Sequence, residues 1–308
     1  MEQQITKDQF AVVGKNIQKM ESVSRPSLTY WQDAWRRLKK NKMAFTGLII
    51  ICLYVLLAIF APIFSSYPYD AQDASAISQS PSAAHWFGTD NLGRDLFTRV
   101  WMGARVSLTI GFLATVINTL MGCILGGLSG FFGGRFDLVF MRVVDVLYGI
   151  PSLIVTMLVM AVLGPGIQSL IIAMCIVGWI GTCRFVRGEM MKLKNNDYVS
   201  AAIVLGVAKH KIIFKHILPN IMGLIITNLT LAIPNAIFQE AFLSYIGIGI
   251  APPQASWGVL AKEGVKYLRT FPHQLFIPAI FICTTMLALN LLGDGLRDAF
   301  DPKLRGTE

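Results

Sequence analysis

Residues 43–64 read MAFTGLIIICLYVLLAIFAPIF, with no charged side chain among them. An α-helix of about 20 apolar residues crosses the hydrocarbon core of a bilayer, so this stretch is long enough to span a membrane. Further apolar stretches follow at intervals along the chain. They are Val106–Phe132, Leu138–Leu163, Ile167–Cys183, Ile221–Ile246 and Phe276–Leu292. The sequence therefore predicts an all-α, polytopic membrane protein with six transmembrane helices.

The composition of the whole chain agrees with a membrane environment. Of its 308 residues, 54% are hydrophobic and 15% are charged, whereas soluble domains contain about 25% charged residues. A net charge of +9 is also found in proteins that bind nucleic acids. Here, however, the basic residues cluster at the ends of the apolar stretches, which membrane topology explains. We therefore expect a lipid membrane, and no nucleic acid, among the partners.

The distribution of Lys and Arg predicts the orientation of the spans, because cytoplasmic segments are enriched in basic residues. With the N-terminus inside, most of the 27 basic residues fall in the N-terminal tail, in 133–142, in 184–219 and in the C-terminal tail. The basic residues left outside are Arg94, Arg99, Arg105, Lys262, Lys266 and Arg269. We therefore expect both termini in the cytoplasm.

The spans divide the chain into segments. In the cytoplasmic tail 1–42, Trp31, Trp35 and Leu38 recur at helical spacing opposite basic residues, which predicts an amphipathic interfacial helix. The remaining segments are the first transmembrane helix 43–64, the extracytoplasmic segment 65–105, the core transmembrane domain 106–296 with a cytoplasmic loop 187–219 and an extracytoplasmic loop 247–275, and the cytoplasmic tail 297–308.

Polar side chains within apolar stretches are candidates for a pathway or gate, because each is costly in lipid unless it has a partner. Asn118, Asn235 and Glu240 are such candidates. Glu240 could line a pathway, or it could brace the turn that follows it, and we favour the bracing role. Arg142 and Asp145 are three residues apart and are expected to pair on one helix face.

Small residues and prolines predict local features of the helices. Glycines recur every fourth residue at Gly122, Gly126, Gly130 and Gly134, which favours close packing against a neighbouring helix. Prolines within or near the spans predict kinks, which neighbouring groups can accommodate. They are Pro151, Pro234 and Pro278.

The chain lacks the motifs of several site classes. It contains no G-x-x-x-x-G-K-[ST] phosphate-binding loop, no H-E-x-x-H and no G-x-S-x-G. Its five cysteines show no C-x-x-C spacing. We therefore predict no catalytic residues, no metal site and no cofactor bound by this chain. If the protein uses ATP, another chain must hydrolyse it.

The cytoplasmic loop Arg187–Pro219 is basic and has helical periodicity. Ala201, Ala202, Leu205 and Gly206 are expected to share one face with a small-residue centre. Such a surface suits a groove on a partner protein, and the basic residues around it also suit an anionic membrane leaflet. The residues alone leave both readings open.

The same loop resembles a known motif. Ser200-Ala-Ala-Ile-Val-Leu-Gly206, with Ile217-Leu-Pro219 after it, is similar to the E-A-A-x-x-x-G loop of ATP-binding-cassette (ABC) importer permeases. Ser200 departs from this motif, because the family usually has Glu there. Four regions narrow the resemblance to the oligopeptide and dipeptide (peptide/nickel) branch, and to its second, C-type permease subunit. They are His85–Asp95 with Gly103–Leu108, Glu240–Gly249, Pro252-Pro253 with Ser256-Trp-Gly258, and Gly293–Asp298 with Asp301-Pro302.

This resemblance implies a type I ABC importer permease in a bacterial inner membrane. It implies a second homologous permease subunit, two ATPase subunits that bind ATP and Mg, an extracytoplasmic peptide-binding protein and a peptide substrate. It also implies that the cytoplasmic loop docks on the ATPase. The residues expected to couple are Ser200, Ala201, Ala202, Leu205, Gly206 and Pro219.

Two kinds of alternative stay open from the sequence. The same machinery could import dipeptides or nickel, because the pathway lining of a permease need not carry the specificity. A secondary transporter driven by an ion gradient is a different class, and it would usually show intramembrane ion-coupling residues and internal repeats. Co-purification with an ATPase separates the two classes.

Overall fold

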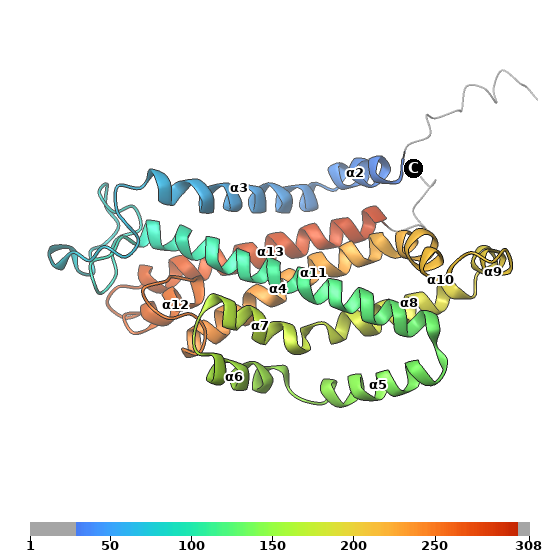
Figure 1. The fold of residues 1–308 in the computed structure, drawn as a ribbon. Helices are drawn as coiled ribbons and strands as arrows, with labels where there is room; N and C mark the ends of the chain where they lie inside the picture. Colours follow the sequence, from blue (N-terminus) through green and yellow to red (C-terminus); the bar gives the residue numbers. More distant parts are fainter. Residues whose placement is uncertain (1–28, 301–308) are drawn as a thin grey trace, which may run out of the picture.

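The computed structural model describes residues 29–300, and this part of the chain is helical without a β-strand (Figure 1). The tail 1–28 and the Asp301-Pro302 motif lie outside the described residues. The helices are α2 (Tyr30–Lys40), α3 (Lys42–Phe64), the short η2 (Ala74–Ala76), α4 (Leu96–Phe132), α5 (Gly134–Tyr148), α6 (Ser152–Leu163), α7 (Ile167–Gly178), α8 (Ile180–Lys194), α9 (Asp197–Val204), α10 (Lys209–Lys211), the π-helical η3 (Ile212–Ile217), α11 (Leu218–Ile246), α12 (Trp257–Val265) and α13 (His273–Phe300).

The structure confirms an all-α membrane protein and corrects its third span. Five helical stretches among the described residues are long and apolar enough to cross a membrane, and there are six if the bent pair α5 and α6 counts as one broken span. We expected one continuous helix over Leu138–Leu163. That expectation is wrong, because α5 and α6 meet at an angle of 80°. Pro151 supplies no backbone N–H and disfavours the helical conformation of Ile150, so the helix ends there.

Four other spans are longer than hydropathy indicated, and the second and the fourth show the reason. The second begins at Leu96 rather than Val106, because the Asp95 side chain caps the helix by accepting a hydrogen bond from the Thr98 N–H (2.8 Å). The fourth runs over Ile167–Lys194, well past the expected end at Cys183. In both cases the helix extends through charged residues, and a search for apolar stretches does not include this part of it.

The glycines of α4 allow it to pack closely on α8. A Cβ atom added at Gly122 would lie 2.6 Å from the Thr182 Cβ, and one at Gly130 would lie 2.8 Å from the Arg187 carbonyl oxygen. Glycine therefore permits a backbone approach that any larger residue would prevent, as the spacing predicted. Gly134 lies outside this contact, because α4 has already ended and α5 begins there.

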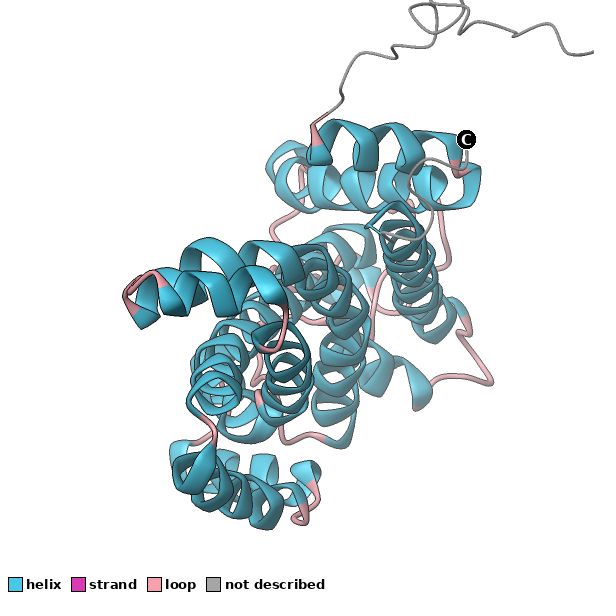
Figure 2. Ribbon diagram, turned by 90° about the vertical axis from the view of Figure 1, so that its right-hand side faces the viewer, coloured by secondary structure: helices cyan, strands magenta, loops and turns pink. Residues whose placement is uncertain are grey.

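The first and last described helices reach the same end of the bundle, as an even number of spans requires. Helices α2 and α9 and the C-terminal end of α13 lie at one end of the bundle, and α12 and the long loop before α4 lie at the other (Figure 1). We call these the cytoplasmic and extracytoplasmic ends. Figure 2 views the bundle from the cytoplasmic end. Helix α3 lies along one margin of the bundle, and α5 and α6 lie along the opposite margin.

Helix α3 is held at both ends. At the cytoplasmic end, α2 and the start of α3 pack on α13 through a cluster that contains Leu38, Ala44 and Phe300. At the other end, Pro62 has no N–H to donate to the Ala58 carbonyl, and the Arg105 Nε of α4 donates to that oxygen instead (3.1 Å). The first span is thus attached to the bundle by specific contacts near both membrane surfaces.

Candidate coupling surface and polar interior

Helix α9, at the cytoplasmic end, presents an outward face of four residues. Ser200, Ala201, Val204 and Leu205 lie on this side and are exposed, and Val204 and Leu205 are 86% and 80% exposed. Their spacing of three and four residues places them on one side of a helix. We call this set the α9 face. Its four residues are small or apolar and uncharged, and the exposed Asp197 lies one turn before them.

Ala202 does not belong to the α9 face. It is buried against Val199, Ile212 and Ile213, in a cluster that fixes α9 on η3. The expectation that Ala201 and Ala202 share one exposed face is therefore wrong, because the packing of α9 on η3 places Ala202 on the buried side of the helix. Val204, which we did not single out, takes the place of Ala202, and its position three residues after Ala201 is the signal that identifies it.

Gly206 ends α9 in a turn that requires glycine. Its φ of 71° lies in the left-handed region, which residues with a Cβ avoid. The Gly206 N–H donates to the Ile203 carbonyl, and the Val207 N–H donates to the Ala202 carbonyl, each at 3.0 Å. This pair of bonds is a Schellman motif. Gly206 therefore aims the α9 face, and no other group lies against it. Pro219 is exposed in the first turn of α11.

Glu240 of α11 is fully buried, and its carboxylate oxygens have partners. The Ser107 hydroxyl of α4 donates to one oxygen (2.6 Å), and the Ser244 hydroxyl donates to the other (2.8 Å). The Trp257 N–H at the start of α12 donates to the Ser107 oxygen (3.3 Å). The carboxylate thus joins three helices, as the bracing interpretation predicts.

The two asparagines named as pathway candidates differ in their surroundings. Asn118 of α4 is packed against α7, where its Nδ2 is 3.5 Å from the Met174 carbonyl oxygen and its side chain fills the space beside Gly178. Asn235 of α11 is exposed, and its Nδ2 contacts only the Leu231 carbonyl of its own helix (3.4 Å). Of the two, Asn235 alone points out of the bundle.

A buried ionic network at the extracytoplasmic end was missed by the sequence analysis. Arg94 and Arg99 both donate to the same Glu263 oxygen of α12 (3.0 Å each), and both lie beside Asp90 (2.6 and 3.4 Å). Asp90, Arg94 and Arg99 are each less than 5% exposed. The network fastens the loop before α4 to α12. The sequence did contain a signal for this network. Asp90 and Arg94 lie in the stretch Gly88-Thr-Asp-Asn-Leu-Gly-Arg-Asp95, which carried the family resemblance.

The loop before α4 contains further polar contacts. Asp95, which caps α4, also accepts a hydrogen bond at 2.9 Å from His85. The Ser65 hydroxyl lies 2.5 Å from the Thr98 hydroxyl and connects the end of α3 to the start of α4. Hydrogen bonds from the Ser75 hydroxyl and N–H lower the pKa of Asp73. We call residues 65–95 together with α12 the cap.

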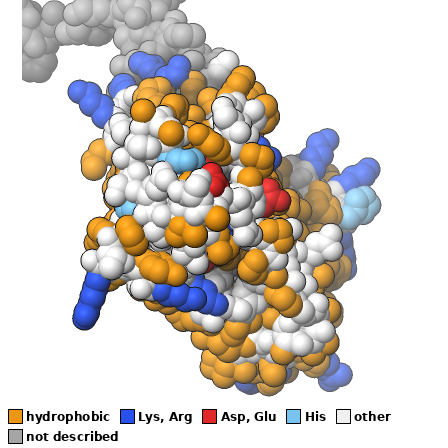
Figure 3. Space-filling model, turned by 90° about the vertical axis from the view of Figure 1, so that its left-hand side faces the viewer, with side chains coloured by type: hydrophobic (Ala, Val, Ile, Leu, Met, Phe, Trp, Pro, Cys, Tyr) orange, Lys and Arg blue, Asp and Glu red, His pale blue; other side chains and the backbone are white. Residues whose placement is uncertain are grey.

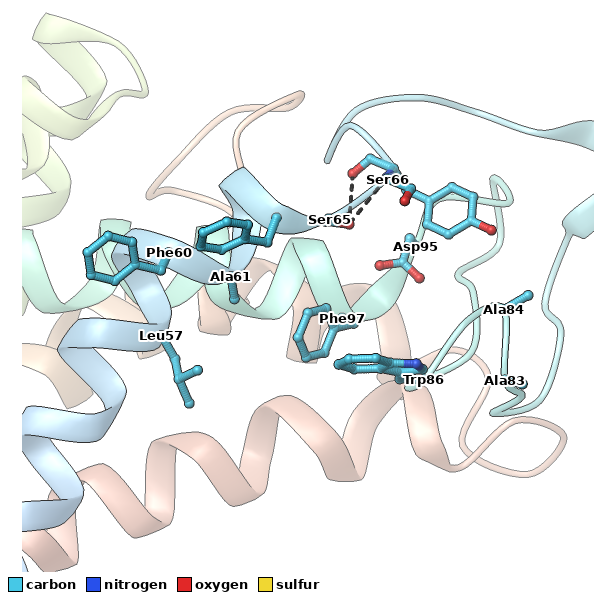
Figure 4. Close-up of a pocket in the computed structure, with 12 residues that line it drawn as sticks. Leu57, Phe60, Ala61, Ser65, Ser66, Ala83, Ala84, Trp86, Asp95 and Phe97 are labelled. Atoms are coloured by element: carbon cyan, nitrogen blue, oxygen red, sulfur yellow. Dashed lines mark hydrogen bonds between the residues drawn. The ribbon is translucent and has the colours of Figure 1, made fainter.

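The outer surface of the cap is mostly uncharged. In the space-filling view of this end, few acidic side chains are visible and the basic ones lie towards the margin (Figure 3). A cavity of about 550 Å³ lies between the end of α3 and the cap. Phe60 and Ala61 of α3 line it together with Trp86 and Phe97 (Figure 4). The Asp95 carboxylate also lines it, but its oxygens already have partners. This cavity is an apolar recess.

Charged residues near the two ends of α5 pair across to α8. Asp145 pairs with Arg184, and Asp137 pairs with Arg187 in a two-pronged contact at 2.5 Å. The expected pairing of Arg142 with Asp145 is therefore wrong, because α8 brings Arg184 to the same carboxylate. These residues line a cavity of about 610 Å³ between the two helices.

Comparisons with known proteins cover nearly the whole chain. Residues 119–306 match the family described as the binding-protein-dependent transport system inner membrane component. Residues 29–81 match the N-terminal transmembrane domain of oligopeptide transport permease C.

Similar proteins come from several bacteria. The oligopeptide transport system permease protein OppC of Bacillus subtilis is 50% identical, over 98% of this chain and 99% of its own length. The dipeptide transport system permease protein DppC of the same strain is 48% identical, over 98% and 95%. The glutathione transport system permease protein GsiD of an Escherichia coli strain is 40% identical, over 90% and 92%.

Proposed function

The chain belongs to the family of binding-protein-dependent transport system inner membrane components, and from that membership we propose that it is the C-type permease subunit of an ATP-driven oligopeptide importer. It is a multi-pass protein of the bacterial inner membrane. The observation that supports the peptide cargo is its similarity, over nearly the full length of both chains, to permeases named for oligopeptide and dipeptide transport.

The α9 face is the proposed contact with an ATPase. The α9 face consists of small or apolar residues, and the one charged residue of α9 is acidic, Asp197 in its first turn. This composition fits a groove on a protein, whereas an anionic membrane surface would favour basic residues at the same positions. The Gly206 turn and the buried side of α9 hold this face in one orientation. Movement of an ATPase subunit would therefore be passed to α8 and α11, which flank the loop, as a rigid-body displacement.

The proposed complex also contains chains that the structure does not include. These are a second homologous permease, which completes the pathway, two ATPase subunits, which bind ATP and Mg, and an extracytoplasmic peptide-binding protein. We propose that this chain has no catalytic role and binds no cofactor itself. The uncharged outer surface of the cap is the part of this chain that lies nearest to the proposed binding protein.

The experiment that tests the proposal changes one residue of the α9 face. Leu205→Asp replaces the largest apolar side chain of the α9 face by a charge, so we expect loss of co-purification with the ATPase subunits and at least a tenfold loss of peptide uptake. Ser200→Asp is the matched control, since it adds the same charge at the edge of the face, where the resembling motif has Glu. Normal uptake by Leu205→Asp, in membranes that contain the full complex, would contradict the coupling role.

A further inference from the structure

The break in the third span leaves backbone groups without partners. In the part of the chain that the structure describes, no backbone N–H donates to the carbonyls of Tyr148, Gly149 or Ile150. All three residues are exposed on this chain. Unpartnered backbone groups are not tolerated against lipid within the hydrocarbon region, where they occur only against protein or a water-filled space. The break must therefore face one of these.

A small cavity lies directly at the break. It has a volume of about 320 Å³, and its wall includes Tyr148, Ile150 and Ser152 from the break and Gln239 from α11. Asn235 lies one turn before Gln239 on the same side of α11 and is exposed. Two uncharged amide side chains therefore stand on the helix that faces the unpartnered carbonyls.

A second cavity continues towards the cytoplasm along α5 and α8. It is the cavity of about 610 Å³ described above, and its acidic residues Asp137 and Asp145 are both paired with arginines of α8. Tyr148 lies between the two cavities, with its ring 4.3 Å from the guanidinium of Arg184. Polar groups thus follow one another from the break to the cytoplasmic end.

We propose that the break in the third span, together with Gln239 and Asn235, is the part of this chain that contacts the peptide during its passage, by hydrogen bonds to the peptide backbone. This inference rests on the proposed function. Carbonyls at the break accept hydrogen bonds from peptide N–H groups, and the side-chain amides both donate and accept. Because none of these groups is charged, the contact recognises what all peptides share and is insensitive to the cargo's side chains.

Accessibility to a water-soluble thiol reagent provides the first test. Single cysteines are introduced as Ser152→Cys, Gln239→Cys and Leu56→Cys, after Cys52, Cys123, Cys175, Cys183 and Cys283 are replaced by serine or alanine. Leu56 is the matched control, because it is an exposed apolar residue of α3. In the assembled transporter, we expect the charged reagent MTSEA (2-aminoethyl methanethiosulfonate) to label Ser152→Cys and Gln239→Cys at least tenfold faster than Leu56→Cys. Added peptide substrate is expected to slow both reactions. Labelling as slow as that of Leu56→Cys would overturn the proposal.

Uptake provides the second test. Gln239→Leu removes the amide at similar volume, so we expect peptide uptake to fall about fivefold, by the same factor for tri-alanine, tri-lysine and tri-glutamate. ATPase co-purification is expected to stay unchanged. A loss confined to one of these peptides would overturn backbone recognition. The variant without the five native cysteines separates this inference from the proposed function. If this variant imports peptide, but Ser152→Cys and Gln239→Cys made in it stay unlabelled, the inference fails and the proposed function stands. If this variant imports no peptide, the proposed function fails.

Discussion

The cap and the break in the third span treat polar groups in opposite ways. In the cap, Asp90 and Arg94 are buried and paired, and Glu263 of α12 accepts hydrogen bonds from both Arg94 and Arg99. At the break, carbonyls are exposed and unpartnered. Satisfied buried networks hold one arrangement, whereas unpartnered groups are available to water or a ligand. This difference supports our proposal that the break contacts the transported peptide, and it predicts that the extracytoplasmic end is the more rigid of the two regions.

The largest expected effect comes from breaking the cap network. Arg99→Ala removes a guanidinium that is 1% exposed and lies between Asp90 and Glu263. Removing one partner of a buried ion pair costs about 3–5 kcal/mol, because the remaining charges lose their compensation. We expect a clear fall in the thermal unfolding midpoint of the complex purified in detergent.

The control for this change is Arg269→Ala, which removes an exposed arginine at the same end of the molecule. Surface changes of this kind stay within about 0.5 kcal/mol. Equal midpoints for the two variants would show that the network does not stabilise the cap, and the contrast between the two regions would lose its basis.

An intermediate effect is expected at Glu240, where the cap joins the membrane helices. Glu240→Leu leaves the Ser107 and Ser244 hydroxyls without their partner, at a cost of about 1–3 kcal/mol. Glu240→Gln keeps hydrogen-bonding groups at both positions, so we expect nearly normal protein levels and normal uptake. If Glu240→Gln were made at full level but failed to transport, Glu240 would belong to the pathway instead of the brace.

The smallest effect on stability is expected at Gly206, at the cytoplasmic end of the molecule. Gly206→Ala puts a Cβ on a residue with a left-handed backbone, at a cost of roughly 1–2 kcal/mol. Because the strain lies at the end of α9, we expect weaker ATPase binding with little change in the unfolding midpoint. Gly206→Asn serves as the matched variant, since asparagine accepts this conformation more readily. Equal ATPase binding by Gly206→Ala and the unchanged protein would show that the turn does not orient the α9 face.

Hydropathy and charge predicted much of this fold, and the reasons for the failures are specific. The number and order of the spans follow from apolar length, and the glycine spacing in α4 correctly indicated close packing. The start of α4 at Leu96 could not be predicted from hydropathy, because the helix begins among charged residues that are neutralised by one another. The break at Pro151 was visible as a proline, but its angle depends on packing that the sequence does not state.

The candidate sites were predicted less completely. The motif around Ala201 and Gly206 located the coupling loop, but a motif does not say which side of a helix is buried, and Ala202 lies inward. The Glu263 partner of Arg94 and Arg99 is more than 150 residues away in sequence, so only the fold brings them together. The fold is also what places Gln239 and the break in the wall of one cavity.

The packing of α3 against α13 has a consequence for the synthesis of the protein. Gly47 lies so close to α13 that an added Cβ would lie 3.3 Å from the Leu292 nitrogen, and Ala44 packs in the cluster with Phe300. Synthesis starts at the N-terminus, so the first helix enters the bilayer before the ribosome has translated the helix it packs against. Until the last transmembrane helix is inserted, α3 has only its apolar length and its contacts with α4, such as that of Arg105, to hold it in place. A chain that stops before Ala288 lacks the surface on which α3 packs. The helix bundle can therefore be completed only after α13 has been translated.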